Sequence, residues 1–206
     1  MNFRDLKDID SWSLKLDQGV VGAHGLFSWL IEERFEFSWH PLGFAMCRIA
    51  KWGPVSLRVH IWPVEMENQQ KPAWLIHDHR FHLTSWVLAG SLENREYQID
   101  YSGSDFAIYN ANYSGDKSLL NKTSASCSKK LTRKIILGKG EVYEVNSGVF
   151  HESLPRSNCS TFTICRTIDE LDSKPKVLGE RKGKRTYAFC RRQVEMLELR
   201  ELLSGI

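Results

Sequence analysis

Four of the seven histidines lie in two short segments, and their spacing suits metal chemistry. His77, His79 and His82 fall within IHDHRFH, and His151 falls within GVFHES. Residues two apart on a strand leave the same face, so the imidazoles of His77 and His79 would lie close together. Such a pair can hold one metal ion, and His151, just after a glycine turn, is the natural third ligand on a neighbouring strand. We therefore predict a metal site at His77, His79 and His151.

Two further residues are candidates for catalysis. His82 is either a fourth ligand, a residue that hydrogen-bonds to a ligand and orients it, or a surface residue after the ligand strand. Tyr97 has a phenol that could move a proton, and the imidazole of His60 offers the same chemistry. We name His82 and Tyr97 as the catalytic candidates.

Candidate substrate-binding residues flank the first histidine pair. Arg58 and His60 alternate with apolar residues on an expected strand, so both leave one face of it. If that face looks inward, Arg58 could bind a carboxylate through two parallel hydrogen bonds; if it looks outward, it is an ordinary exterior arginine. Ser85 could touch a substrate or simply pack. Trp86 could line an apolar pocket together with Trp74 and Tyr97, although aromatic residues also serve as core packing.

The elements that must position these residues are mostly short strands. β-branched and aromatic residues, separated by turn residues such as Gly138 and Gly148, predict strands at 44–51, 55–64, 83–88, 95–100, 134–137, 141–145, 161–166 and 185–189. Apolar spacing predicts helices at 20–34 and 191–203. The polar segment 101–130 is expected to be a long excursion between strands. Many short strands favour a sandwich or barrel.

Composition places the chain among ordinary globular proteins. It has 206 residues, of which 42% are hydrophobic and 26% charged, enough to bury one core. The net charge of +3 is too small to imply nucleic acid. A basic stretch at 174–192 is interleaved with and followed by glutamates, which is typical of a solvated face. The five cysteines form no CxxC pair and are expected to be reduced thiols.

The two histidine segments resemble the two motifs of the cupin superfamily. His77, His79 and Gly90 match the first motif, and Gly140, Gly148 and His151 match the second at the family's spacing. Four positions depart from the family pattern. Turn positions hold Lys71 for Gly, Asn146 for Pro and Pro155 for Asn. The usual glutamate ligand falls on Leu83 or, with the longer spacing, on Thr84.

The resemblance implies a fold and a class of reaction. It implies one all-β cupin jelly roll with a helical extension at 1–40, a barrel at 41–190 and a C-terminal helix at 191–206. Without the glutamate, the ligands are three neutral histidines, similar to those of thiol dioxygenases and of some ring- or diketone-cleaving dioxygenases that use Fe(II). The string HDHRFH is also similar to cysteine dioxygenases. However, one residue is missing and no Cys follows His82, which puts a cysteine substrate in doubt.

Three functions fit this reading. The first is an Fe(II) dioxygenase acting with O₂ on a small molecule. The second is a non-oxidative isomerase, decarboxylase or lyase using Mn, Ni, Co or Zn as a Lewis acid, and the third is a binding module without turnover. By resemblance the chain is expected to form a homodimer. No signal peptide or membrane span is apparent, so we expect a cytoplasmic protein with neither nucleic acid nor membrane as partner.

Overall fold

The computed structural model describes residues 1–203, which form three helices, a short 3₁₀ turn and twelve strands. The 3₁₀ turn spans Phe3–Asp5, and the helices are α1 (Ile9–Asp17), α2 (Ala23–Glu32) and α3 (Met196–Leu203). The strands are β1 (Ser38–Trp39), β2 (Ala45–Trp52), β3 (Val55–Trp62), β4 (Phe81–Ala89), β5 (Ser91–Asp100), β6 (Phe106–Ser114), β7 (Lys117–Gly138), β8 (Val142–Val145), β9 (Phe150–Pro155), β10 (Thr161–Asp169), β11 (Lys176–Glu180) and β12 (Thr186–Cys190).

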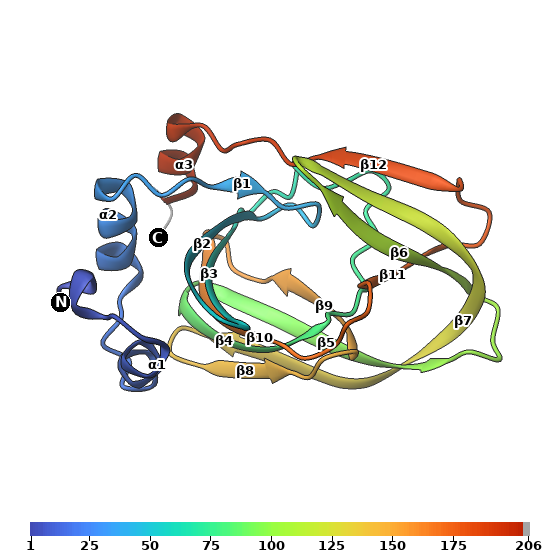
Figure 1. Ribbon diagram of the computed structural model, residues 1–206, viewed down its shortest axis with the longest axis horizontal. Coiled ribbons are helices and arrows are strands. Elements are labelled where there is room, and N and C mark those ends of the chain that lie inside the picture. Colours follow the sequence, from blue (N-terminus) through green and yellow to red (C-terminus); the bar gives the residue numbers. More distant parts are fainter. Residues whose placement is uncertain (204–206) are drawn as a thin grey trace.

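The strands form two antiparallel sheets that face each other (Figure 1). The first sheet has the order β1-β2-β3-β10-β4-β8, and the second has the order β11-β6-β7-β5-β9, with β12 added beside β7. Neighbours such as β3 and β10 are far apart in sequence, so the chain crosses repeatedly between the sheets. The predicted all-β jelly roll with helices at both ends is confirmed.

The helices cover the outer face of the first sheet (Figure 1). Leu26 and Leu30 of α2, together with Leu199 of α3, join the same buried cluster as Val59 and Ile61 of β3. Burying this apolar face requires the alternate residues of β3 to point the other way, into the space between the sheets. The helices thus determine which side chains face the interior.

The glycines of the two histidine motifs hold turns that other residues would strain. Gly90, Gly140 and Gly148 all have positive φ, at 73°, 87° and 75°. Gly90 joins β4 to β5, and a Cβ atom there would lie 2.8 Å from the Cα of Thr161. This position therefore needs glycine both for its backbone conformation and for space.

Several predictions about the elements are wrong. Residues 101–130 are no excursion: most of them form β6 and the first part of β7, a long hairpin whose residues are mostly only partly buried or exposed. The C-terminal helix begins at Met196 and not at residue 191, because Gln193 still bridges to Ser38 of β1. Its expected last residues, 204–206, lie outside the described part of the chain. Helix α1 lies within the helical extension predicted at 1–40, but its bounds were not predicted, although Asp8 caps it by accepting a hydrogen bond from Ser11 N at 2.8 Å.

Within residues 1–203, no helix combines the length and the apolar character needed to cross a bilayer.

Candidate metal centre

Three histidines converge between the sheets. His77 N donates to His151 O at 3.0 Å, and His151 N donates to His77 O at 2.8 Å, so the backbone itself joins the two motifs. His79 completes the group from the segment that leads into β4. The candidate ligand atoms of the three side chains all lie within 4.8 Å of one another. The predicted ligand residues are therefore brought together.

Backbone carbonyls orient two of the three rings. His77 Nδ1 lies 2.7 Å from Leu75 O, and His151 Nδ1 lies 3.3 Å from Val149 O. A carbonyl oxygen only accepts, so each Nδ1 must carry the ring proton. The Nε2 atom of each ring then keeps its lone pair. Such a bond from the other ring nitrogen is typical of histidines that bind metals, because it determines both the tautomer and the orientation of the ring.

Burial also keeps the rings neutral. Desolvation lowers the pKa of His77, and it lowers the pKa of His79 well below its ordinary value, with nearby His77 and His151 adding to the effect. Desolvation, with His77 beside it, lowers the pKa of His151 to about 3. All three imidazoles therefore present lone pairs at neutral pH, the form that a metal ion requires.

The geometry fits a divalent transition-metal ion. His77 Nε2 and His79 Nε2 are 2.9 Å apart. This is close to the roughly 3 Å that separates adjacent ligands when each metal–nitrogen bond is about 2.1 Å. His79 also has a buried Nδ1 without a hydrogen-bond partner. The ring of Phe81 stacks on His79 at 4.3 Å between centroids and shields it from water.

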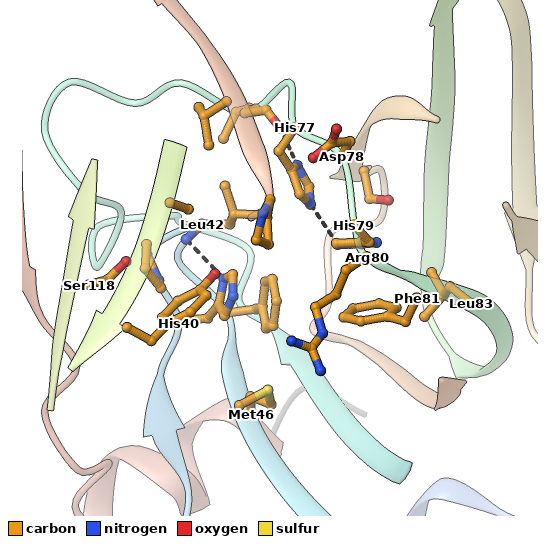
Figure 2. A pocket seen from close by; sticks show the side chains of 18 of the residues that line it. His40, Leu42, Met46, His77, Asp78, His79, Arg80, Phe81, Leu83 and Ser118 are labelled. Carbon is orange, nitrogen blue, oxygen red and sulfur yellow. Dashed lines mark hydrogen bonds between the residues drawn. The ribbon is translucent and has the colours of Figure 1, made fainter. Parts of the chain in front are cut away.

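The histidines line a cavity of about 690 Å³ (Figure 2). Its walls come from both sheets and from the segments that lead into β2 and β4. Apolar side chains contribute a large part of the lining, among them Leu42, Phe44, Met46, Trp62, Trp74 and Leu83. This volume lies within the range of sites that bind small molecules.

Arg58 and His60 face this cavity, as one of the two alternatives for β3 requires. The guanidinium of Arg58 lies 5.0 Å from the centre of the Phe81 ring and makes no ion pair within the described chain. Desolvation lowers the pKa of Arg58, but an arginine stays protonated at neutral pH. His60 contacts Cys165 Sγ through Nδ1 at 3.5 Å, and desolvation with Arg58 nearby lowers its pKa to about 3.

Positive charge dominates the rest of the lining. Arg48, Lys51, Lys174 and Arg191 all contribute to it. The two lining carboxylates are already engaged: Asp78 accepts a hydrogen bond from the backbone N of Lys176, and Asp169 accepts one from Arg80 at 3.1 Å. The lining that residues 1–203 provide therefore carries excess positive charge, which favours an anionic ligand.

The catalytic candidate His82 lies outside the cavity, and the prediction for it is corrected. It alternates with Phe81 and Leu83 on β4, so it points out of the cavity, where its Nδ1 lies 3.1 Å from Asn146 Oδ1. Because Phe81 and Leu83 line the cavity and the side-chain period of a strand is two, His82 between them lies on the other face of β4.

Tyr97, the other catalytic candidate, also lies outside the cavity. It packs with Phe150 in a separate buried cluster of the second sheet and donates a hydrogen bond to Glu152 Oε1 at 2.6 Å. Desolvation and Glu152 raise the pKa of Tyr97 to about 12. Since Phe150 and His151 point to opposite faces of β9, Tyr97 cannot reach the histidine cluster, and the prediction for it is corrected.

Two predicted substrate contacts also change. Trp86 faces the helices, where its Nε1 donates to Asp17 Oδ1 of α1 at 2.9 Å, so it is not a cavity residue. Ser85 points inward but is fully buried behind Cys165, which donates to its hydroxyl at 3.2 Å. Trp74, in contrast, does line the cavity.

His40 also lines the cavity, although the sequence did not predict it as a site residue. His40 follows β1 and lies across the pocket from His79 (Figure 2). The sequence feature that could have indicated this residue is its position directly before a turn that contains Pro41 and Gly43. It lies outside both histidine motifs, so motif spacing could not find it.

Comparisons with known proteins provide little further information. No protein-family model matches the chain, and no curated protein matches it. A chain from the crystal structures of the DMSP lyases RdDddP and RnDddQII shares 11% identity over 64% of this chain, with a TM-score of 0.35. This chain matches about half, 51%, of that chain's length. Streptomyces PAC13 with uridine shares 7% identity over 77% of this chain and 87% of its own, with a TM-score of 0.36. Identities this low carry no information on function.

Proposed function

We propose that this protein is a metal-dependent enzyme that oxidises a small acidic molecule with O₂, using Fe(II) held by His77, His79 and His151. The observation that carries the proposal is the convergence of three neutral, desolvated imidazoles on one side of a cavity. Two of them are fixed by backbone carbonyls with Nε2 unprotonated. A bound Fe(II) ion would supply redox chemistry and open coordination positions, which three protein ligands leave free.

The protein's own residues would bind and shield the substrate. Arg58 offers a desolvated guanidinium that makes no ion pair within residues 1–203, and a carboxylate gains more from a two-bond contact there than it would in water. The apolar side chains of Phe44, Met46 and Trp62 would hold the body of the molecule. Phe81 both stacks on His79 and lies beside Arg58, so it separates the ligand histidines from bulk water at that point.

The decisive experiment measures metal and oxygen together. Protein purified without oxygen is analysed for metal content as wild type and as His77→Ala, His151→Ala and His82→Ala. We expect about one iron per chain in the wild type and in His82→Ala, and loss of iron in the other two variants. Oxygen uptake is then measured with thiols, diketones and aromatic acids.

Other outcomes would change the proposal. Retention of zinc, nickel, cobalt or manganese in preference to iron, with turnover that consumes no oxygen, would indicate the non-oxidative enzyme. Absence of stoichiometric metal in every preparation would exclude the catalytic site and leave a binding module. Retention of iron in His151→Ala would show that the ligand set is wrong.

A further inference from the structure

His40 differs from the candidate ligands in the nitrogen that carries its proton. The backbone N of Leu42 donates to His40 Nδ1 at 3.2 Å. A backbone amide only donates, so His40 Nδ1 must keep its lone pair, and in the neutral ring the proton sits on Nε2. This is the reverse of His77 and His151, whose Nδ1 atoms face carbonyls. His40 is therefore a hydrogen-bond donor through Nε2 and not a fourth metal ligand through that atom.

The donor atom is free to meet a ligand. His40 Nε2 makes no hydrogen bond with any residue in the described part of the chain. The atom is also not fully buried, so a ligand can reach it. The residue lines the cavity, and its ring interacts electrostatically with His60 and His77. His40 thus has an unused N–H group and lines the same cavity as the candidate metal ligands.

A tight turn holds this ring in place. His40 N donates to Phe44 O, and Gly43 N donates to His40 O, each at 2.8 Å. The Phe44 ring stacks on the imidazole at 4.4 Å with an angle of 10° between the planes. Gly43 has φ of 92°, and a Cβ atom there would lie 2.5 Å from Gln69 Cγ. A group held this rigidly loses little entropy when it binds a ligand.

Burial keeps the donor neutral. Desolvation, followed by electrostatic interactions with His60, His77 and Arg58, holds the pKa of His40 well below its ordinary value. A neutral N–H suits an uncharged oxygen acceptor, whereas the guanidinium of Arg58 suits a carboxylate. The cavity therefore contains two different polar groups that can bind one molecule.

We infer that His40 is a substrate-binding residue that donates through Nε2 to a carbonyl or hydroxyl oxygen, so that the substrate is a small carboxylic acid bearing a second, uncharged oxygen. This inference rests on the proposed function for its substrate, and it adds a specificity determinant to the same cavity.

Pairs of acids that differ by one keto oxygen test the inference. The probes are pyruvate with propionate, phenylpyruvate with hydrocinnamate, and acetoacetate with butyrate. Their affinities are measured by calorimetry on Zn(II)-loaded protein, which cannot turn them over by oxidation. We expect at least one oxo acid to bind the wild type about fivefold or more tightly than its partner, the value of one neutral hydrogen bond of about 1 kcal/mol.

Two variants separate the donor from the turn. In His40→Asn the amide oxygen can still accept from Leu42 N, but the Nε2 donor is lost, so the oxo-acid preference should fall about fivefold while zinc content and affinity for the plain acid persist. In His40→Gln the amide nitrogen can replace Nε2, so part of the preference should return. Thermal unfolding of both variants checks that they are folded.

The outcomes are separable from those of the proposed function. An unchanged preference in His40→Asn would assign it to the metal ion and overturn the role of His40, as would the absence of any oxo-acid preference in the wild type. Failure to bind stoichiometric metal is recorded separately and would overturn the proposed function. An oxo-acid preference that depends on His40 would still support His40 as a binding residue in that case.

Discussion

The direction in which a side chain leaves its strand separates the functional residues of this protein from similar residues nearby. His79 and His82 are three positions apart, yet one belongs to the buried cluster and the other faces Asn146 outside it. The same effect directs Arg58 into the cavity, because its neighbour Val59 is buried against the helices on the opposite face of β3. Residue type alone does not distinguish these positions.

His82→Ala should therefore leave the site intact. We expect metal content and oxygen uptake within twofold of wild type, since the side chain does not line the cavity. The matched control is His151→Ala, which should lose the metal. If His82→Ala lost metal or activity as completely as the control, His82 would have to be part of the metal site.

Trp86→Phe should affect stability and not chemistry. The indole donates to Asp17 of α1, so losing this hydrogen bond should reduce the free energy of unfolding by about 1–3 kcal/mol. Urea denaturation measures the loss, and oxygen uptake per bound metal should remain that of wild type. A lower affinity for substrate in a folded variant would contradict the position of Trp86 on the helix side.

Turns place the two histidine motifs next to each other. His151 follows the turn at Gly148, and Gly148 N donates to His79 O at 2.8 Å, so the turn itself contacts the other motif. Gly90 ends β4 and lies against Thr161 of β10. These short connections hold β4, β9 and β10 in the register on which the cluster depends.

Gly90→Ala should cost more than a positive φ alone explains. Gly53, also at positive φ, has open space where a Cβ would lie, so Gly53→Ala measures the backbone strain, about 1 kcal/mol. Gly90→Ala adds a collision with the Thr161 backbone, and we expect a loss above about 2 kcal/mol. Equal losses in chemical denaturation would show that the contact with Thr161 is relaxed at no cost.

The molecule holds five histidines whose imidazoles are removed from water. His40, His60, His77, His79 and His151 all have their pKa lowered, with desolvation as the largest cause. Such a histidine binds a proton in the unfolded chain at a pH where the folded chain does not. Its contribution to stability is complete above the ordinary pKa of 6.5 and is lost as the pH falls towards the folded value.

Metal-free protein should therefore be sensitive to acid. His60 and His151, with pKa values of about 3, should each cost about 2 kcal/mol between pH 7.5 and pH 5, at about 1.4 kcal/mol for each pH unit below 6.5. Urea denaturation of EDTA-treated protein across this range measures the decline, and His60→Gln should make it shallower. A flat profile would mean that these rings are protonated or hydrated in the folded protein.

The sequence alone was enough to predict most strands, the histidine cluster and the turns in the two histidine motifs. β-branched and aromatic residues between turn residues predicted most strands. The positions of His77, His79 and His151 predicted the cluster, because ligands two apart on extended backbone share a face. Turn glycines in both motifs predicted where the backbone must reverse. These features are local, so they can be read without knowledge of the fold.

Only the tertiary structure decided what faces the cavity. The inward side of β3 depends on the helices that cover its other side, and Tyr97 and Trp86 are excluded because their faces of the sheets are packed elsewhere. The hairpin of β6 and β7 is polar in sequence because most of its residues are only partly buried or exposed, a property that depends on its place in the second sheet. His40 joins the site through contacts between segments distant in sequence, which no local pattern records.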